Sequence, residues 1–305
     1  MNRLVHSTGG SLRSMQISSK QLFVFVEGGL DRVFYDRLLR FSKVNMQNQY
    51  EIRAAKELPN GMGGKVGLTQ HFDELKRRGA LQGSALGKSY TSVFVFDKDI
   101  DDLTRKKLRS KHALYTNTYD LEGHLLMCGD LIDALASAAQ ITLEQAKRVI
   151  GDPSSFLQKI AITWSDWIAL CILSHIHSIS VGCSYTLSSQ INTNGLGPTD
   201  ISERDKYLVK LSNRTGQSVD ELRRRMEYYS KAVKSEARKG NPFKFFRGKW
   251  MKTIFQEDVA KRIVAADAQV HGLSERLLAI LVANIGGANC SCCTLQEDAF
   301  KQLLT

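Results

Sequence analysis

Two uninterrupted apolar runs constrain the fold of this chain more than any other feature. Leu22–Val26 reads LFVFV and is followed directly by Glu27, and Val93–Phe96 reads VFVF and is followed directly by Asp97. Short apolar runs without polar alternation are typical of strands buried on both faces, as in a parallel sheet. In open sheets of this kind, ligand sites form at the carboxyl ends of the strands. The two runs therefore predict an α/β fold with an acidic site at one edge of its sheet.

Strand and helix patterns alternate between residues 19 and 130. Further strands are predicted at 50–54 and 113–119, and helices at 31–41, 68–78 and 103–111. The first of these helices is expected to bury one apolar face, formed by Val33, Phe34, Leu38 and Phe41. This alternation predicts a parallel sheet flanked by helices.

The pattern becomes mainly helical after about residue 130. Capping-box sequences predict helix starts at Thr142 and Ser218, and Gly240 ends the second of these helices. A tryptophan-bearing apolar segment at 160–177 is expected to form a buried helix.

These patterns divide the chain into three expected parts. We expect a loosely attached N-terminal arm at 1–18, a metal-binding catalytic α/β domain at 19–130 and a helical domain at 131–305. The helical domain is expected to serve nucleic-acid binding, dimerisation or contact with a partner.

Composition is that of a globular protein with a substantial core. Of the 305 residues, 43% are hydrophobic and 24% are charged. No run reaches the roughly 20 apolar residues needed to span a bilayer, and the N-terminal segment lacks the apolar core of a signal peptide. The tract from Cys290 to Cys293 has no second ligand pair at a spacing suited to zinc. We therefore expect structural thiols, no membrane contact and a cytoplasmic location.

The acidic residues after the predicted strands are candidate metal ligands. Glu27, Asp97 and Asp99 follow the two apolar runs, Asp31 lies one helical turn after Glu27, and Glu122 follows a third predicted strand. Carboxylates that lie close together repel one another unless a cation neutralises them, and their hard oxygens match Mg²⁺ or Mn²⁺. Along an extended segment, Asp97 and Asp99 would point to the same side. Glu122 would serve a second ion, and the alternative is a solvated acidic loop.

Basic residues concentrate in one segment of the predicted helical domain. The chain carries a net charge of +11, and residues 203–262 contain 17 Lys or Arg against 8 Asp or Glu. Cations interleaved with aromatic residues suit phosphate contact and base stacking. The candidate nucleic-acid contacts are Arg223, Arg224, Lys244, Arg247 and Lys252. We expect Lys249 to stabilise charge on a scissile phosphate; the alternative is a solvated helix face above a core of Phe and Trp.

A glycine-rich turn offers a weaker candidate for phosphate contact. Gly63, Gly64 and Lys65 resemble part of a phosphate-binding loop, but Pro59 and Val66 stand where that motif requires Gly and Ser or Thr. The ordinary interpretation is a turn with positive-φ glycines. Contact between its backbone N–H groups and a phosphate remains an alternative.

The spacing of the acidic motifs resembles that of the TOPRIM domain, which primases, topoisomerases and OLD-family nucleases share. Its hallmark is a strand that ends in Glu-Gly and a later strand that ends in Asp-x-Asp, matched here by Glu27-Gly28 and Asp97-Lys98-Asp99. The chain is more similar to stand-alone TOPRIM proteins encoded beside ABC-type ATPases in anti-phage defence. Those proteins share the pattern Glu-Gly-x-x-Asp-x-x-Phe-Tyr, which residues 27–35 match. The size and helical tail resemble those of PARIS effectors.

This resemblance implies a function that the residues alone do not establish. It implies a metal-dependent nuclease, held inactive by an AriA-like ABC-type ATPase, that dimerises on release and cleaves host tRNA. It also implies that Glu27 is a metal ligand or general base, and that Asp31, Asp97 and Asp99 hold the ion.

Three alternative functions are left open or weighed. The first is an OLD-like nuclease that cleaves DNA. The second is a non-catalytic TOPRIM module that binds its ATPase partner or RNA. The third is a receiver-like phosphoacceptor, although the Asp-x-Asp pair and the basic helical tail fit that class poorly.

Overall fold

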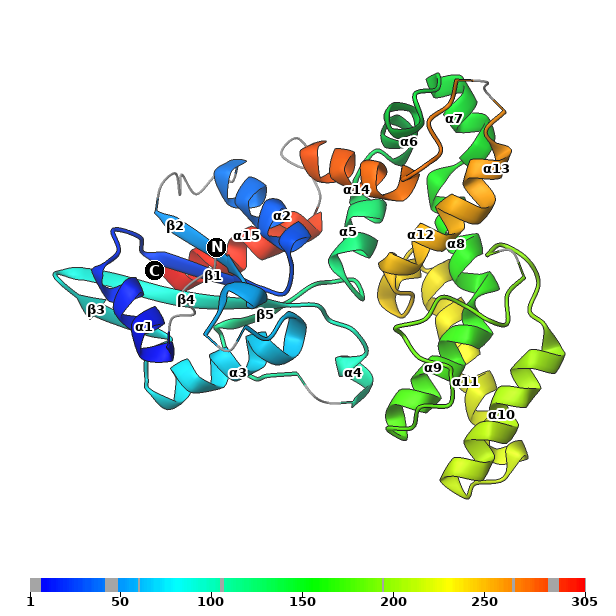
Figure 1. The fold of residues 1–305 in the computed structure, drawn as a ribbon, viewed down its shortest axis with the longest axis horizontal. Coiled ribbons are helices and arrows are strands. Elements are labelled where there is room, and N and C mark those ends of the chain that lie inside the picture. Colours follow the sequence, from blue (N-terminus) through cyan, green and yellow to red (C-terminus); the bar gives the residue numbers. More distant parts are fainter. Residues whose placement is uncertain are drawn as a thin grey trace. The chain divides into compact units, whose positions relative to one another are not determined.

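The computed structural model divides the chain into two compact units (Figure 1). The first comprises Met1–Lys98, Lys106–Thr116 and Val282–Thr305, and the second comprises Asp99–Arg105 and Asn117–Leu281. The structure describes residues 7–41, 49–59, 61–104, 107–193, 195–264, 267–284 and 291–304. Met1–His6 of the predicted arm, Asn60 of the glycine-rich turn, Arg105 and Lys106 of a predicted helix, and Cys290 lie outside the described residues.

The first unit is built on a five-stranded sheet that is mostly parallel. Strand β1 (Leu22–Val26) lies between β2 (Tyr50–Ala54) and β4 (Lys88–Phe96), and both neighbours run parallel to it. Strand β5 (Ala113–Tyr115) pairs with β4 in parallel, whereas β3 (Gln82–Ala85) pairs with β4 antiparallel. The parallel sheet flanked by helices, followed by a mainly helical region, confirms the predicted α/β class. The antiparallel strand β3 was not predicted.

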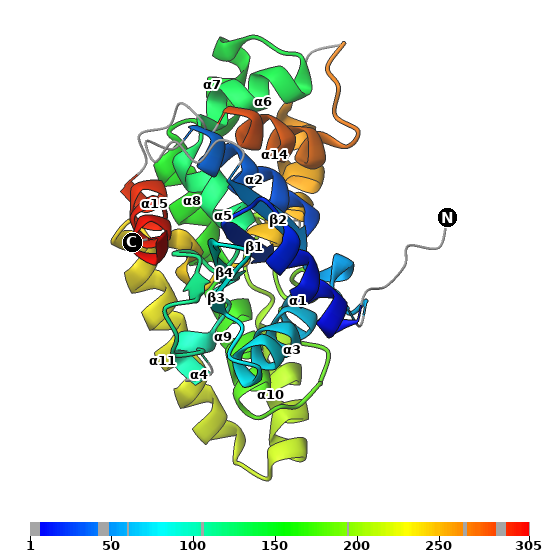
Figure 2. The same cartoon turned by 90° about the vertical axis from the view of Figure 1, so that its left-hand side faces the viewer.

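Alternation along β1 and β4 explains why both faces of this sheet are covered by helices. One face carries Phe23, Phe25, Phe94 and Phe96, which pack with helices α1 (Thr8–Ile17) and α3 (Gly64–Arg77). The intervening valines point to the other face, where α2 (Gly29–Phe41) and α15 (Ser291–Leu304) lie (Figures 1 and 2). All five residues of β1 are fully buried, and each large side chain contributes about 1.5–3 kcal/mol through burial.

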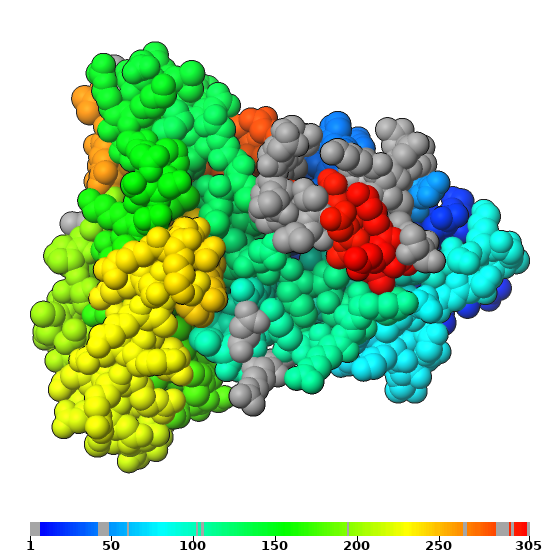
Figure 3. All heavy atoms as spheres, turned by 180° about the vertical axis from the view of Figure 1, so that it is seen from behind, coloured from blue at the N-terminus to red at the C-terminus, as the bar shows by residue number. Residues whose placement is uncertain are grey.

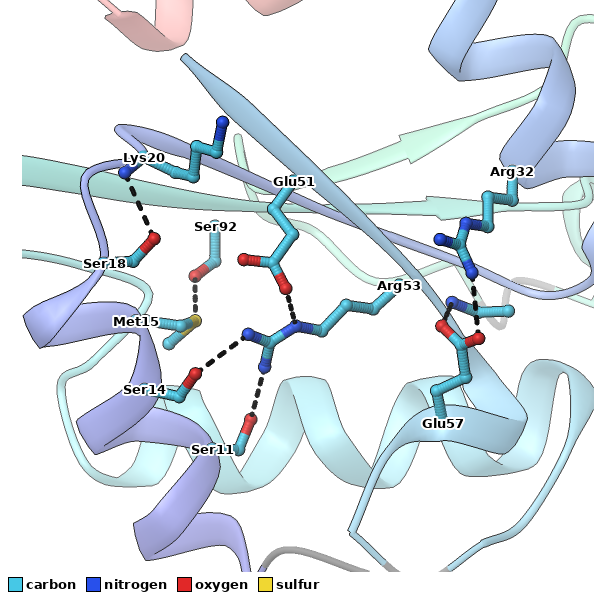
Figure 4. Close-up of polar contacts among 11 residues, drawn as sticks. Ser11, Ser14, Met15, Ser18, Lys20, Arg32, Glu51, Arg53, Glu57 and Ser92 are labelled. Carbon is cyan, nitrogen blue, oxygen red and sulfur yellow. Dashed lines mark hydrogen bonds and ion pairs between the residues drawn. The ribbon is translucent and has the colours of Figure 1, made fainter. Parts of the chain in front are cut away.

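Helix α1 is attached to the sheet by a polar network around Arg53 of β2 (Figure 4). The Arg53 guanidinium donates to Glu51 at 2.7 Å and to the hydroxyls of Ser11 and Ser14 at 3.3 and 3.2 Å. Met15 of α1 is buried against the sheet core. We expected a loosely attached arm at 1–18, whereas residues 8–17 form a helix that covers one face of the sheet.

The local predictions require two corrections in the first unit. Helix α2 buries Phe34, Tyr35, Leu38 and Leu39, whereas Val33 and Phe41 are 48% and 58% exposed, so the buried stripe is rotated from the predicted face. The predicted strand at 113–119 ends at Tyr115.

The second unit is helical. Its elements are α4 (Asp101–Thr104), α5 (Leu121–Cys128), α6 (Leu131–Ala139), α7 (Leu143–Ile150), α8 (Pro153–Thr163), α9 (Ser165–Ile176), α10 (Ile201–Thr215), α11 (Val219–Arg238), α12 (Met251–Ile254), α13 (Ala260–Arg262) and α14 (Leu273–Asn284), whose last three residues belong to the first unit. Short 3₁₀ turns at Pro242–Lys244 and Gly248–Trp250 lead into α12. The predicted basic helix at 103–111 is wrong within the described residues, because α4 ends at Thr104 and residues 107–109 are irregular.

Helix caps in this unit follow the sequence closely. The Thr142 hydroxyl and the Gln145 side chain form the predicted capping box of α7, and the Ser218 hydroxyl accepts the Glu221 N–H at the start of α11. The predicted helix at 160–177 is instead two helices that meet at Trp164. No single described helix has both the length and the apolarity to cross a membrane; Leu143–Thr163 and Ser165–Ile176 meet that criterion only jointly, with a 55° bend between them.

Candidate active site

The side chains predicted to form one centre are distributed between the two units. Glu27, Asp31 and Asp97 lie in the first unit, as does Lys65. Asp99, Glu122 and Lys249 lie in the second unit.

Glu27 and Asp97 meet at the carboxyl edge of the sheet. Val26 lies opposite Val95 in the parallel pairing of β1 and β4, so both strands end at the same edge. The Glu27 Oε1 atom accepts the backbone N–H of Asp97 at 2.9 Å. A direct hydrogen bond therefore joins the two acidic motifs, which are separated by 70 positions in the chain.

Asp31 is placed by the tight turn that follows Glu27. Its Oδ2 atom accepts the backbone N–H of Gly28 at 2.9 Å, and it lies in the first turn of α2, where the helix dipole favours a negative charge. A Cβ atom at position 28 would lie 3.1 Å from this oxygen. The glycine of the Glu-Gly motif therefore allows the carboxylate to close onto the turn.

Tyr35 is a neighbour of these carboxylates that sequence reasoning did not assign. Its phenol is fully buried, and burial raises its pKa well above the ordinary value, with further increases from the nearby charges of Asp31 and Asp97. Its ring packs edge-on against Phe34 and Phe300, with ring centroids 4.8 and 6.1 Å away. In the sequence, Tyr35 was marked only as the last residue of the pattern Glu-Gly-x-x-Asp-x-x-Phe-Tyr.

Lys65 lies at the same edge of the sheet. It follows Gly64, which has a φ of +65°, in the first turn of α3, and its Nζ atom donates to the backbone carbonyl of Asp97 at 2.8 Å. Gly67 permits this turn, because a Cβ atom there would lie 1.9 Å from the Met62 carbonyl oxygen. The structure thus brings Lys65 to the acidic edge, whereas phosphate contact by Gly63 and Gly64 stays a prediction.

The chemistry of these carboxylates suits a divalent cation, but their arrangement is not a preformed metal site. Carboxylate oxygens without sulfur or imidazole partners are the donor set of Mg²⁺ or Mn²⁺. Within the ranges that the structure describes, however, no three His, Cys, Asp or Glu side chains are grouped so that they could hold a metal ion. Glu27 has directed one oxygen to the Asp97 amide, and ligation through that oxygen requires the bond to open.

Asp99 does not continue the extended strand as predicted. Its φ is +50°, a left-handed conformation, and its backbone N–H donates to the Tyr119 carbonyl at 2.8 Å. The chain turns at Asp99, so the extended backbone from which we inferred that Asp97 and Asp99 point to the same side ends before Asp99.

Asp120 organises the acidic segment of the second unit. Its carboxylate is completely buried and accepts three backbone N–H groups, from Gly123 at 3.0 Å, Gly248 at 2.9 Å and Lys249 at 3.3 Å. Burial raises the pKa of Asp120, and these hydrogen bonds oppose that increase. One side chain therefore caps α5 and holds the turn that carries Lys249. Sequence reasoning missed this role, although Asp120 directly precedes the segment Leu-Glu-Gly.

Glu122 and Lys249 are neighbours as a result of this anchoring. We predicted that Glu122 follows the end of a strand, but it lies in the first turn of α5. Its Oε1 atom lies 3.8 Å from Lys249 Nζ. The backbones of Gly123 and Gly248 are in contact, and a Cβ atom on Gly248 would lie 2.1 Å from the Gly123 nitrogen.

Most of the predicted nucleic-acid contacts are engaged with the protein itself. Arg223 pairs with Asp205 and Asp220, Lys244 with Glu236, and Lys252 with Glu275, while Arg247 donates to the Tyr185 carbonyl. Arg224 is exposed and has no ion pair among the described residues.

The aromatic residues of the basic segment belong to the core of the second unit. Phe243, Phe246 and Trp250 are at most 3% exposed. Trp250 stacks on Tyr185 with ring centroids 5.3 Å apart and lies 5.4 Å from Trp164. The expectation that these rings stack on bases is not supported, because each ring already packs inside the protein.

No family model matches the sequence, and no curated protein matches it.

Proposed function

We propose that this chain is a metal-dependent phosphodiesterase that cleaves nucleic acid, with Glu27 as its central carboxylate. The observation that carries the proposal is the hydrogen bond between Glu27 Oε1 and the Asp97 N–H, with Lys65 Nζ on the carbonyl of the same residue. Two acidic motifs and a cation thus meet at the edge of a parallel sheet where ligand sites form.

Each of these side chains has a role in the proposal. Glu27 positions the Asp97 segment and, on releasing its amide, becomes a ligand or a base for the attacking water. Asp31 and Asp97 supply negative charge for Mg²⁺ or Mn²⁺. When bound, the ion would neutralise phosphate charge and lower the pKa of a water molecule. Lys65 fixes the Asp97 carbonyl and supplies a positive charge for a phosphate oxygen.

Lys249 of the second unit is proposed as a further phosphate-binding cation. Its backbone is fixed by Asp120 and its ammonium lies beside Glu122. Its side chain is 46% exposed, so a phosphate oxygen has access to it.

The TOPRIM resemblance adds substrate and partner to the proposal. On that basis the substrate is host tRNA, the regulator is an ABC-type ATPase of the same anti-phage defence system, and the active form is a homodimer. Cleavage of DNA and a purely non-catalytic binding role are the competing proposals.

A cleavage assay separates these proposals. Purified wild type, Glu27→Gln and Asp73→Asn would be incubated with total tRNA and with supercoiled plasmid, each with Mg²⁺, Mn²⁺ or EDTA. Asp73 is an exposed carboxylate on α3 of the same unit and serves as the matched control. We expect metal-dependent cleavage of tRNA by wild type and Asp73→Asn and none by Glu27→Gln. Plasmid cleavage alone would favour the DNA nuclease, and equal cleavage by Glu27→Gln would refute the assignment.

A further inference from the structure

One face of α11 carries cations together with an exposed tyrosine. Arg224, Tyr228, Lys231 and Arg238 are exposed and are separated by four, three and seven residues, so they share a face of the helix. The opposite face is buried and consists of Leu222, Met226, Ser230, Val233 and Ala237. Figure 3 shows the outer surface of this helix in yellow.

The cations on this face differ from most of those predicted from the sequence. Arg224, Lys231 and Arg238 form no ion pair with any carboxylate of the described residues. Glu227, at the side of the face, is exposed and likewise forms no ion pair there. The cations of this face are therefore not neutralised by carboxylates of the described residues, whereas Arg223 pairs with Asp220 and Lys244 pairs with Glu236.

Tyr228 presents an aromatic ring to solvent, whereas Phe243, Phe246 and Trp250 of this unit are buried. Its side chain is 69% exposed, and its ring contacts the Tyr229 ring edge-on with centroids 5.4 Å apart. An aromatic face that is open to solvent among cations suits stacking on a base, and stacking of this kind requires a base that is not paired in a duplex.

We propose that Arg224, Tyr228, Lys231 and Arg238, here named the α11 row, bind an unpaired stretch of nucleic acid. The cations contact phosphates and Tyr228 stacks on a base. From Arg224 to Arg238 the helix rises about 21 Å, which corresponds to about six nucleotides at the ~3.4 Å rise of a stacked strand. The inference deepens the proposed function, since the ligand belongs to its substrate class.

The test measures binding rather than cleavage. The full chain carrying Glu27→Gln is titrated in EDTA against a fluorescent single-stranded RNA of about 12 nucleotides, the same sequence as DNA, and a blunt duplex. Lys231→Gln/Arg238→Gln is compared with Arg148→Gln/Lys159→Gln, which removes two exposed cations from α7 and α8 of the same unit. We expect the α11 double variant to weaken single-strand binding about tenfold and to reduce the salt slope by about 1.4, as two lost phosphate contacts require.

Tyr228 provides a second, charge-independent readout. Tyr228→Ala is expected to weaken single-strand binding roughly tenfold, whereas Tyr228→Phe, which keeps the ring, retains it. Equal binding by the α11 double variant and its control, a preference for duplex, or equal competition by polyglutamate would overturn the α11 row while leaving the nuclease proposal standing. Absence of any nucleic-acid binding by the Glu27→Gln chain in EDTA would likewise overturn the α11 row, whereas the nuclease proposal is overturned only by the cleavage assay with metal.

Discussion

The Asp120 carboxylate joins two segments that lie 128 residues apart, because its Oδ1 atom accepts the Gly248 N–H at 2.9 Å. The same carboxylate caps α5 through Gly123. A single buried charge thus couples the helix that carries Glu122 to the turn that carries Lys249. Removing it should affect stability and Lys249 together.

Asp120→Ala is expected to be strongly destabilising. The change leaves the buried N–H groups of Gly123 and Gly248 without their acceptor, and each unsatisfied group costs about 1–3 kcal/mol. We expect the free energy of unfolding, measured with urea, to fall by about 3 kcal/mol or more. Asp130→Ala removes the exposed cap of α6 and should cost only about 1 kcal/mol; equal losses in the two variants would contradict the anchoring role.

Gly248→Ala tests the contact between the two glycine backbones. The added methyl group would lie 2.1 Å from the Gly123 nitrogen, so the turn must move, and overpacking of this kind costs about 1–3 kcal/mol. For Gly9→Ala in α1, the nearest atom of the described residues is the Ser7 hydroxyl oxygen, 3.9 Å from the added carbon, so the change should be neutral or stabilising by up to about 1 kcal/mol. Thermal unfolding of both variants measures the difference, and an unchanged Gly248→Ala protein would show that the backbones are not in close contact.

Lys65→Met tests the cation at the acidic edge. The variant loses the donor to the Asp97 carbonyl and a positive charge at the proposed phosphate position, so cleavage at saturating metal should slow by at least roughly tenfold, equivalent to about 1.4 kcal/mol. Lys65→Arg should recover part of the rate, and Lys56→Met, an exposed lysine of the same unit, should leave it unchanged. Full activity in Lys65→Met would show that Lys65 has no role in cleavage.

Two buried histidines predict a loss of stability in mild acid. Burial lowers the pKa of His71 and of His124 from 6.5 to about 4. Between these values the unfolded chain binds more protons than the folded chain, so stability falls as the pH is lowered from about 6.5 to about 4. His71→Leu should flatten the dependence of unfolding free energy on pH, whereas His271→Gln, which changes an exposed histidine, should not. The same slope in His71→Leu and wild type would assign the effect to other groups.

Structure was predicted best from the sequence where it depends on local residues, as in an apolar strand or a helix cap. Strands β1 and β2 were predicted at their observed bounds, and the cap at Thr142 was correct because side-chain and backbone geometry are local. Strand β3 was missed because Gln82–Ala85 has neither alternation nor β-branched residues. Helix α15 lies in the segment that was predicted to be helical, but its place in the first unit was not predicted, because it depends on distant partners, such as Tyr35 against Phe300.

The acidic residues of the site could be predicted from the sequence, but the hydrogen bonds that they form could not. Strand ends with acidic residues pointed to Glu27 and Asp97, and parallel pairing brought them together. The turn at Asp99 and the buried role of Asp120 depend on backbone conformation and on contacts across 128 residues, which periodicity does not encode.

The most direct test of the central claim is the rate of phosphodiester cleavage as a function of Mg²⁺ concentration, measured under single-turnover conditions for wild type and Glu27→Gln. We predict a rate that rises with Mg²⁺ and saturates in wild type, and a loss of at least about a thousandfold, or about 4 kcal/mol, in the variant at every concentration. A wild-type rate that is the same in EDTA, or a variant that cleaves as fast as wild type, would contradict it.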